Sequence, residues 1–254
     1  MTSKVAVTLE VQNARISYSE HVAVDIESLS LSGSVISLLG HNGAGKSTLI
    51  KAILGLLDVQ KGSLQIKDHL GRLLLSERDM AFCPESGAVF SDVLVEKYLE
   101  LWCRIKHNNG AHYRKSGAKY IDRLSLAPLL RKKGRELSKG QRRRVQTALG
   151  FMGDPRLFLF DEPFDGLDVQ RTAELMELVK EESLQRAFII SSHRMDVMER
   201  ISDSVMVLRQ GTIAAAGSLQ QVQSALYGAN QPTGQVPNLT DAMAHHLKEL
   251  AQGC

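Results

Sequence analysis

The chain has 254 residues, a length that permits one large hydrophobic core or a core with one small attached lobe. Hydrophobic residues make up 43% and charged residues 23%, as in ordinary soluble proteins, and the longest apolar runs are far too short to cross a bilayer. The net charge of +3 does not by itself imply a nucleic-acid partner, and the three widely spaced cysteines argue against a disulfide framework or a zinc site.

Short apolar runs alternate with helical patterns, which is typical of an α/β protein with a largely parallel sheet. Met1–Lys4 leads directly into a strand-like segment, so no signal peptide is expected. The expected strands are Val5–Val11, Val35–Leu39, Ser63–Ile66, Met80–Cys83, Leu157–Phe160, Ala187–Ser191 and Ser204–Leu208. The expected helices are Lys46–Leu57, Val169–Glu182 and Met195–Ile201.

The middle of the chain has a different character. Residues from about 91 to 152 lack a convincing strand pattern, and Val93, Lys97, Leu101 and Ile105 follow a helical spacing. We therefore expect one domain over residues 1–227, with an all-helical lobe over about 85–153 inserted in the α/β core. Residues 228–254 are expected to form a Gly-, Pro- and Gln-rich linker followed by a short amphipathic helix, Asn238–Leu250.

Residues 40–48 fit the phosphate-loop pattern GxxxxGK[ST], between an apolar strand and a helix. Glycines allow successive backbone N–H groups to surround an anion, and the helix adds the positive end of its dipole. Lys46 would supply charge to the β- and γ-phosphates, and the Ser47 hydroxyl would bind Mg²⁺. The candidate nucleotide-binding residues of this loop are Gly40, Asn42, Gly43, Ala44, Gly45, Lys46, Ser47 and Thr48.

Two carboxylates follow the apolar strand Leu157–Phe160. In a phosphate-loop ATPase, a carboxylate at this place orients Mg²⁺, normally through water, and we assign that role to Asp161. Glu162 could polarise the attacking water as a general base. Alone, the motif also fits a buried strand that ends at a helix N-cap.

Leu137–Gln141 immediately precedes a basic helical stretch. In isolation it also fits a serine N-cap. With the phosphate loop and the paired carboxylates it resembles the ATP-binding-cassette (ABC) family, whose signature loop is most often Leu-Ser-Gly-Gly-Gln; Lys139 departs from that pattern. The resemblance implies that Ser138, Gly140 and Gln141 bind the γ-phosphate of ATP held by the opposite subunit of a dimer.

Further positions match the family in order, and the resemblance covers roughly residues 8–222. It implies that Tyr18 stacks on adenine, that Asp168 lies in a loop crossing the dimer interface, and that His193 is a catalytic switch residue contacting the γ-phosphate. From the residues alone, Tyr18 also fits a core position in an edge strand, and His193 a surface or core histidine.

One position departs from the family. Where the sheet leads into the helical lobe the family usually has glutamine, and this chain has Glu85. The expected metal-binding residues are therefore Ser47, Asp161 and Glu85, the last adding a charge to the site.

A basic run includes Arg131–Arg135 and Arg142–Arg144. It could be a nucleic-acid patch, but it has no interleaved aromatic residues. A solvated helix face, or a positive field for ATP, explains it better, so no nucleic-acid partner is expected.

The resemblance implies a P-loop NTPase core with an N-terminal antiparallel β element and the inserted helical lobe. It implies an ATPase that uses ATP and Mg²⁺, in which two chains sandwich two nucleotides. The signature loop and Pro237–Met243 are similar to those of bacterial ABC-2-type exporters, whose ATPase and membrane permease are separate chains. Such a subunit would lie peripherally at the cytoplasmic face of the bacterial inner membrane, in a homodimer or heterodimer on polytopic permease subunits. The alternative is a cassette ATPase that transmits force, or acts in assembly or repair, without moving cargo.

Overall fold

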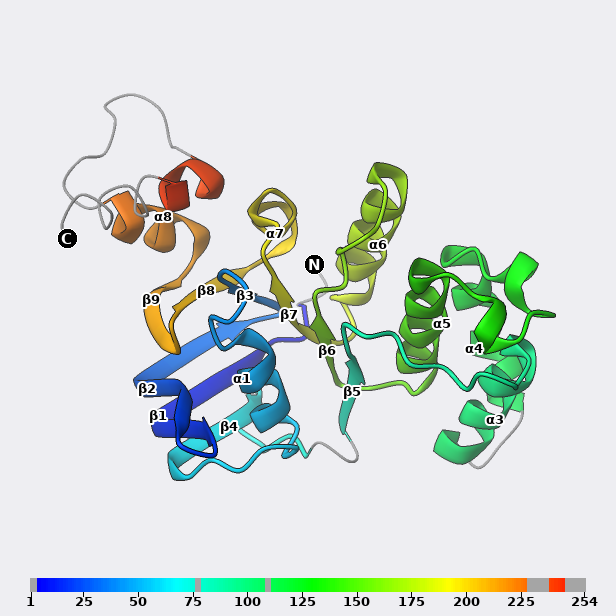
Figure 1. Cartoon of the computed structure of the whole chain (residues 1–254), viewed down its shortest axis with the longest axis horizontal. Coiled ribbons are helices and arrows are strands. Elements are labelled where there is room, and N and C mark those ends of the chain that lie inside the picture. The colour runs from blue at the N-terminus through cyan, green and yellow to red at the C-terminus, as the bar shows by residue number, and fades with distance from the viewer. Residues whose placement is uncertain (1–3, 76–78, 108–110, 228–237, 245–254) are drawn as a thin grey trace.

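The computed structural model describes residues 4–75, 79–107, 111–227 and 238–244, and within them the chain forms two sheets (Figure 1). The smaller is antiparallel with strand order β2-β1-β4, built from β1 (Val7–Tyr18), β2 (His21–Gly33) and β4 (Lys61–Asp68). The larger has the order β5-β6-β7-β3-β8-β9. These sheets confirm the predicted α/β class with its N-terminal antiparallel element.

The larger sheet is parallel except for its last pair, β8 and β9. Its strands are β3 (Val35–Leu39), β5 (Met80–Cys83), β6 (Leu157–Asp161), β7 (Ala187–Ser192), β8 (Ser204–Arg209) and β9 (Thr212–Gly217). Strand β7 lies between β6 and β3, with Asp161 opposite Ser191 and Leu39 opposite Ser192. Residues that follow these three strands therefore meet at one edge of the sheet, where α/β proteins bind ligands.

Helices cover both faces of the larger sheet. They are α1 (Lys46–Ile53), α3 (Val95–His107), α4 (Ala111–Arg123), α5 (Lys139–Met152), α6 (Val169–Glu182), α7 (Met195–Ile201) and α8 (Leu219–Tyr227). Helix α1 contacts β1, β4 and β6, so it lies between the two sheets. Figure 1 shows α6 and α7 on the other side of the larger sheet and α3, α4 and α5 beyond its β5 edge.

The alternation of side chains in β6 divides the core into two clusters. Leu157 and Leu159 join the cluster around α1 and the antiparallel sheet, whereas Phe158 and Phe160 join the cluster under the helices of the opposite face. All four side chains are fully buried, and burial of each contributes about 1.5–3 kcal/mol. The continuous apolar run identifies a strand that is buried on both faces.

The helical lobe forms, but α3 buries a different face from the one that the sequence indicated. Val95, Leu99 and Cys103 are its buried residues, whereas Leu101 and Ile105 are exposed at 47% and 65%. On the core side, the Nζ of Lys119 lies 2.6 Å from the buried carboxylate of Glu182 in α6, so an ion pair ties α4 to the core.

Several element bounds differ from expectation. Helix α1 ends at Ile53 rather than at residue 57, because Gly55 takes a left-handed backbone with φ of 68°. Strand β1 extends to Tyr18, and both β2 and α8 went unanticipated. The expected linker lies outside the described residues; of the expected C-terminal helix, residues 239–244 are helical and bury Leu239 and Ala242. None of the helices in the described ranges is long and apolar enough to span a membrane.

Candidate active site

The loop between β3 and α1 has the geometry of a phosphate cradle. A Cβ on Gly40, where φ is 153°, would lie 2.5 Å from the carbonyl oxygen of Leu208. Gly45 caps α1 with φ of 103°, and a Cβ there would lie 2.8 Å from the carbonyl oxygen of Ala23. Only glycine fits these two positions. The first-turn N–H groups of α1 have no partner inside the helix, and residues 41–43 of the preceding loop are exposed.

Lys46, the first residue of α1, is buried at the base of this loop. Its Nζ donates to the carbonyl oxygens of Gly40 at 2.7 Å and His41 at 3.1 Å. It also lies 3.3 Å from Oε1 of Glu162, which forms an ion pair with it and has no hydrogen-bond partner in the described structure. The structure therefore joins the predicted phosphate-binding cation to the predicted general base.

The hydroxyl of Ser47 and the carboxylate of Asp161 also meet here. Ser47 Oγ donates to Asp161 Oδ1 at 2.9 Å, and Ser191 Oγ of β7 donates to the same oxygen at 2.6 Å. In the described ranges no cluster of three or more His, Cys, Asp or Glu residues could hold a metal by itself. Two adjacent protein oxygens nevertheless suit Mg²⁺, which keeps waters and substrate phosphates in most of its coordination sites.

Glu162 stands on a strained turn directly after β6. Its φ is 49°, a left-handed value that non-glycine residues rarely adopt. Its N–H is held by the carbonyl oxygen of Ser191 at 3.2 Å and by Ser191 Oγ at 3.0 Å. Its Oε2 accepts the N–H of His193 at 3.3 Å and lies 3.0 Å from Nδ1 of that ring. Glu162 is therefore buried between Lys46 and the half-exposed His193.

The signature-loop residues lie elsewhere in the chain. Ser138 is the N-cap of α5: its Oγ accepts the N–H of Gln141 at 3.3 Å, and Gln141 Oε1 accepts the N–H of Ser138 at 3.0 Å. The interpretation of Ser138 as an N-cap is thus confirmed. It is compatible with phosphate binding by this loop, because both interpretations place the loop at a helix N-terminus. Lys139, which departs from the family pattern, lies 3.3 Å from Asp165. Figure 1 shows α5 separated from α1 by β5 and β6.

The remaining predicted residues lie in three different settings. Tyr18 ends β1 and is 43% exposed, so the alternative of a core tyrosine is wrong. Asp168 caps α6, with Oδ1 accepting the N–H of Arg171 at 2.8 Å. Glu85 is exposed, and its backbone carbonyl oxygen accepts a hydrogen bond from Arg143.

Arg143 is a site-linked residue that sequence reasoning missed. It is 3% exposed, so the expectation of a solvated basic helix face is wrong at this position. Its Nη1 donates to the carbonyl oxygens of Glu162 at 2.7 Å and Asp165 at 2.6 Å, and its Nη2 donates to that of Glu85 at 2.7 Å. Buried Ser191 was missed too, since a serine in an apolar strand carries no motif.

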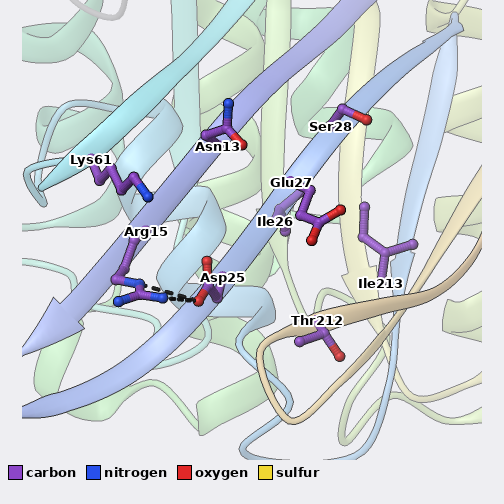
Figure 2. Close-up of a pocket in the computed structure, with 9 residues that line it drawn as sticks. All are labelled: Asn13, Arg15, Asp25, Ile26, Glu27, Ser28, Lys61, Thr212 and Ile213. Atoms are coloured by element: carbon purple, nitrogen blue, oxygen red, sulfur yellow. Dashed lines mark hydrogen bonds and ion pairs between the residues drawn. The ribbon is translucent and has the colours of Figure 1, made fainter.

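An open groove of about 570 Å³ lies apart from this constellation (Figure 2). Its walls come from β1, β2, β9 and Lys61, and Arg15 pairs across it with Asp25 at 2.5 Å. None of the predicted nucleotide-binding residues lines it. The predicted phosphate loop, both carboxylates and His193 lie instead at the edge formed by β3, β6 and β7.

Comparison with known proteins places these features in a family. The family model described as ABC transporter matches residues 25–165, and a model described as an AAA domain, putative AbiEii toxin, matches residues 134–199. The chain is 30% identical over 186 residues to ATP-binding cassette sub-family A member 2 of Rattus norvegicus, covering 72% of this chain but 8% of that protein. It is 28% identical to an ABC transporter ATP-binding protein of Methanocaldococcus jannaschii, covering 75% of this chain and 69% of that one.

Solved structures agree. A structure of the ATP-binding subunit of an ABC transporter superimposes with a TM-score of 0.81 and 26% identity, covering 94% of this chain and 99% of that one. A dimeric cassette in a post-hydrolysis state with ADP and Pi gives a TM-score of 0.73 at 19% identity, covering 83% and 98%, which supports the fold. The match extends over more than half of the chain and includes its phosphate loop, its signature loop and both carboxylates. The chain belongs to the ABC transporter family as an ATP-binding domain, and it spans only a small part of the length of the sub-family A relatives that it matches.

Proposed function

We propose that this chain binds MgATP at residues 40–48 and hydrolyses it in a dimer, as the ATPase subunit of a transporter whose membrane permease is a separate chain. The observation that carries the proposal is the arrangement of Lys46, Glu162 and His193 beside the Ser47–Asp161 pair. Five side chains, from the start of α1 and from the ends of β6 and β7, meet at one sheet edge, and each has a distinct use in phosphoryl transfer.

Each residue has a role that follows from its position. Lys46 neutralises charge on the β- and γ-phosphates, while the N–H groups of the loop and of α1 surround them. Mg²⁺, when bound through Ser47 and Asp161, would neutralise charge developing between those phosphates. Glu162 accepts the proton of the attacking water, and its buried setting and its contact to His193 fix its carboxylate. His193, half-exposed on the same edge, is placed to contact the γ-phosphate.

The site is completed in this proposal by a second cassette subunit. Ser138, Gly140 and Gln141 stand at the N-terminus of α5, a helix that Figure 1 shows separated from α1 by β5 and β6. An anion at that terminus would meet unpaired N–H groups and the positive end of the helix dipole. Asp168 and Tyr18 take the interface and adenine-stacking roles, and the exposure of the Tyr18 ring supports the latter. Glu85 stays a proposed metal-shell residue.

A groove supports the proposed permease partner. About 580 Å³ lies open between strand β5 and helices α3 and α5, lined in part by Phe82, Tyr98 and Trp102. Aromatic walls of this kind suit an inserted element of another protein. With separate permease chains of an exporter, the subunit would lie peripherally at the cytoplasmic face of the inner membrane. No nucleic-acid partner is proposed.

Two variants test the ATPase roles. Lys46→Ala should abolish measurable ATP binding, because the phosphates lose their main cation. Glu162→Gln should retain ATP binding and lower kcat by about 10²-fold or more, since it keeps the shape of the side chain and removes the base. Binding is measured with a fluorescent nucleotide and hydrolysis by phosphate release. Hydrolysis at the wild-type rate by Glu162→Gln would overturn the assignment of the base.

A further inference from the structure

A buried guanidinium connects the signature-loop helix to the hydrolysis site of the same chain. Arg143 follows Ser138 by little more than one turn of α5, and 3% of its surface is exposed. Among the described residues its acceptors are all backbone carbonyl oxygens, at 2.6–2.7 Å. Burying a charge without a carboxylate partner is unfavourable unless several hydrogen bonds replace its hydration. Arg143 is therefore not one of the solvated charges of this helix, and its burial must serve the loops that it contacts.

The acceptors of Arg143 belong to two loops of the site. Nη1 donates to the backbone carbonyl oxygens of Glu162 and Asp165, which are the two ends of the turn after β6. The turn itself is closed by a hydrogen bond from the N–H of Asp165 to the carbonyl oxygen of Glu162, at 3.2 Å. Nη2 bonds the carbonyl of Glu85, in the loop after β5. One rigid, planar fork thus sets the spacing between these loops, which a flexible lysine would not do.

The turn needs such support. Glu162 has φ of 49°, and residues in this region keep that conformation only when the surrounding contacts hold it. Ser191 holds the N–H side of Glu162, and Arg143 holds its carbonyl side. Without Arg143, the carboxylate would still reach Lys46 and His193 but in a wider range of orientations.

We propose that Arg143 is a positioning residue for ATP hydrolysis, which fixes the backbone of Glu162 and links it to the helix that carries the signature loop. This inference rests on the proposed role of Glu162 as general base. The inference also connects two ATP sites through one chain. The N-terminal end of α5 would face the ATP bound by the partner subunit, and Arg143 joins this helix to Glu162, which acts on the ATP bound by its own chain.

The central test is Arg143→Met, which keeps an unbranched apolar stem in the buried position and removes every donor. We expect kcat to fall by about 10- to 100-fold, the range associated with a misplaced catalytic group, while KM for ATP stays within about twofold. Arg143→Lys keeps the buried charge and one donor group, so its kcat should be intermediate. The phosphate loop does not contact Arg143, so ATP binding should be preserved in both variants.

Arg144→Met is the matched control. Arg144 neighbours Arg143 on α5, is partly buried, and donates to the carbonyl oxygens of Leu124 and Ser125 inside the lobe at 3.2 and 3.3 Å. This variant should lose thermal stability while kcat stays within about twofold of wild type, since no residue placed at the site of hydrolysis loses a hydrogen bond. An equal loss of kcat in both variants would mean that damage to α5 is the cause, and would overturn the proposal.

A double-mutant cycle separates positioning from a merely structural role. Single-turnover hydrolysis is measured for Glu162→Gln with and without Arg143→Met. If Arg143 acts through Glu162, the double variant is no slower than Glu162→Gln alone. Losses that multiply would overturn the proposal and leave the proposed function intact. Wild-type hydrolysis by Glu162→Gln would instead refute the proposed base, and with it this inference.

Discussion

Ser191→Ala removes the hydroxyl that bonds both Asp161 and Glu162. Ser191 is fully buried on β7, between β6 and β3. Its Oγ donates to Asp161 Oδ1 at 2.6 Å and accepts the N–H of Glu162 at 3.0 Å, so one side chain fixes both carboxylate residues. Alanine fits the same space and removes both bonds.

The magnitude follows from the kind of each bond. Loss of the hydrogen bond to the Asp161 carboxylate destabilises by about 1.5–3 kcal/mol. The N–H of Glu162 keeps the backbone carbonyl of Ser191 at 3.2 Å, so losing the hydroxyl there adds at most about 1 kcal/mol. The free energy of unfolding should fall by about 1.5–4 kcal/mol, and the Tm by roughly 3–16 °C for a chain of this size.

Ser192→Ala provides the control on the same strand. Ser192 is equally buried, but its Oγ accepts only the neutral N–H of Arg194, at 3.0 Å, so its removal should destabilise by about 0.5–1.5 kcal/mol. Urea unfolding measures both variants, and phosphate release shows whether Ser191→Ala also lowers kcat, by about 10-fold. Equal losses of stability in the two variants would show that the charged acceptor of Ser191 adds nothing to the strength of its hydrogen bond, which would contradict the larger effect expected for Ser191→Ala.

Three further predictions concern other residues. Hydrogen bonds from the N–H of Arg72 and the side chain of Arg156 lower the pKa of Asp68 from 3.8 to about 2. The stabilisation by Asp68 is therefore complete above pH 3.8 and is lost as the pH falls toward about 2; in Asp68→Asn, urea titrations should show a flatter loss of stability over that interval. If Glu85 reaches Mg²⁺, Glu85→Gln should need more Mg²⁺ for half-maximal hydrolysis, whereas superimposable Mg²⁺ titrations would remove Glu85 from the metal shell. Tyr18→Ala should raise KM for ATP by about 3- to 10-fold through lost stacking and Tyr18→Phe should not; equal KM values would exclude stacking.

Features coded by short, local patterns could be predicted from the sequence. Strand β3 and helix α6 were predicted to the residue, because an apolar run before the phosphate loop and an amphipathic stretch behind the Asp168 cap are local signals. The meeting of Lys46 with Glu162 and His193 was also predictable, since neighbouring parallel strands must end at one edge.

Other features depend on tertiary contacts that no local pattern records. Helix α3 carries two apolar stripes, and only packing against the lobe decides that Leu99 is buried and Ile105 exposed. Arg143 looked like part of a solvated basic run, because its acceptors come from loops distant in sequence. Whether residue 85 reaches a metal could not be decided from its place in a motif.

In the proposed mechanism MgATP joins two of these chains across their phosphate and signature loops, and the mass of the protein in solution shows whether it does. The mass of Glu162→Gln is determined by light scattering on size exclusion, with and without saturating MgATP. The measured mass should be that of a monomer without MgATP and that of a dimer with it, because this variant binds the nucleotide and does not hydrolyse it. Adding Lys46→Ala to that variant should keep it monomeric. A Glu162→Gln protein that stays monomeric while MgATP is bound would contradict the sandwich mechanism.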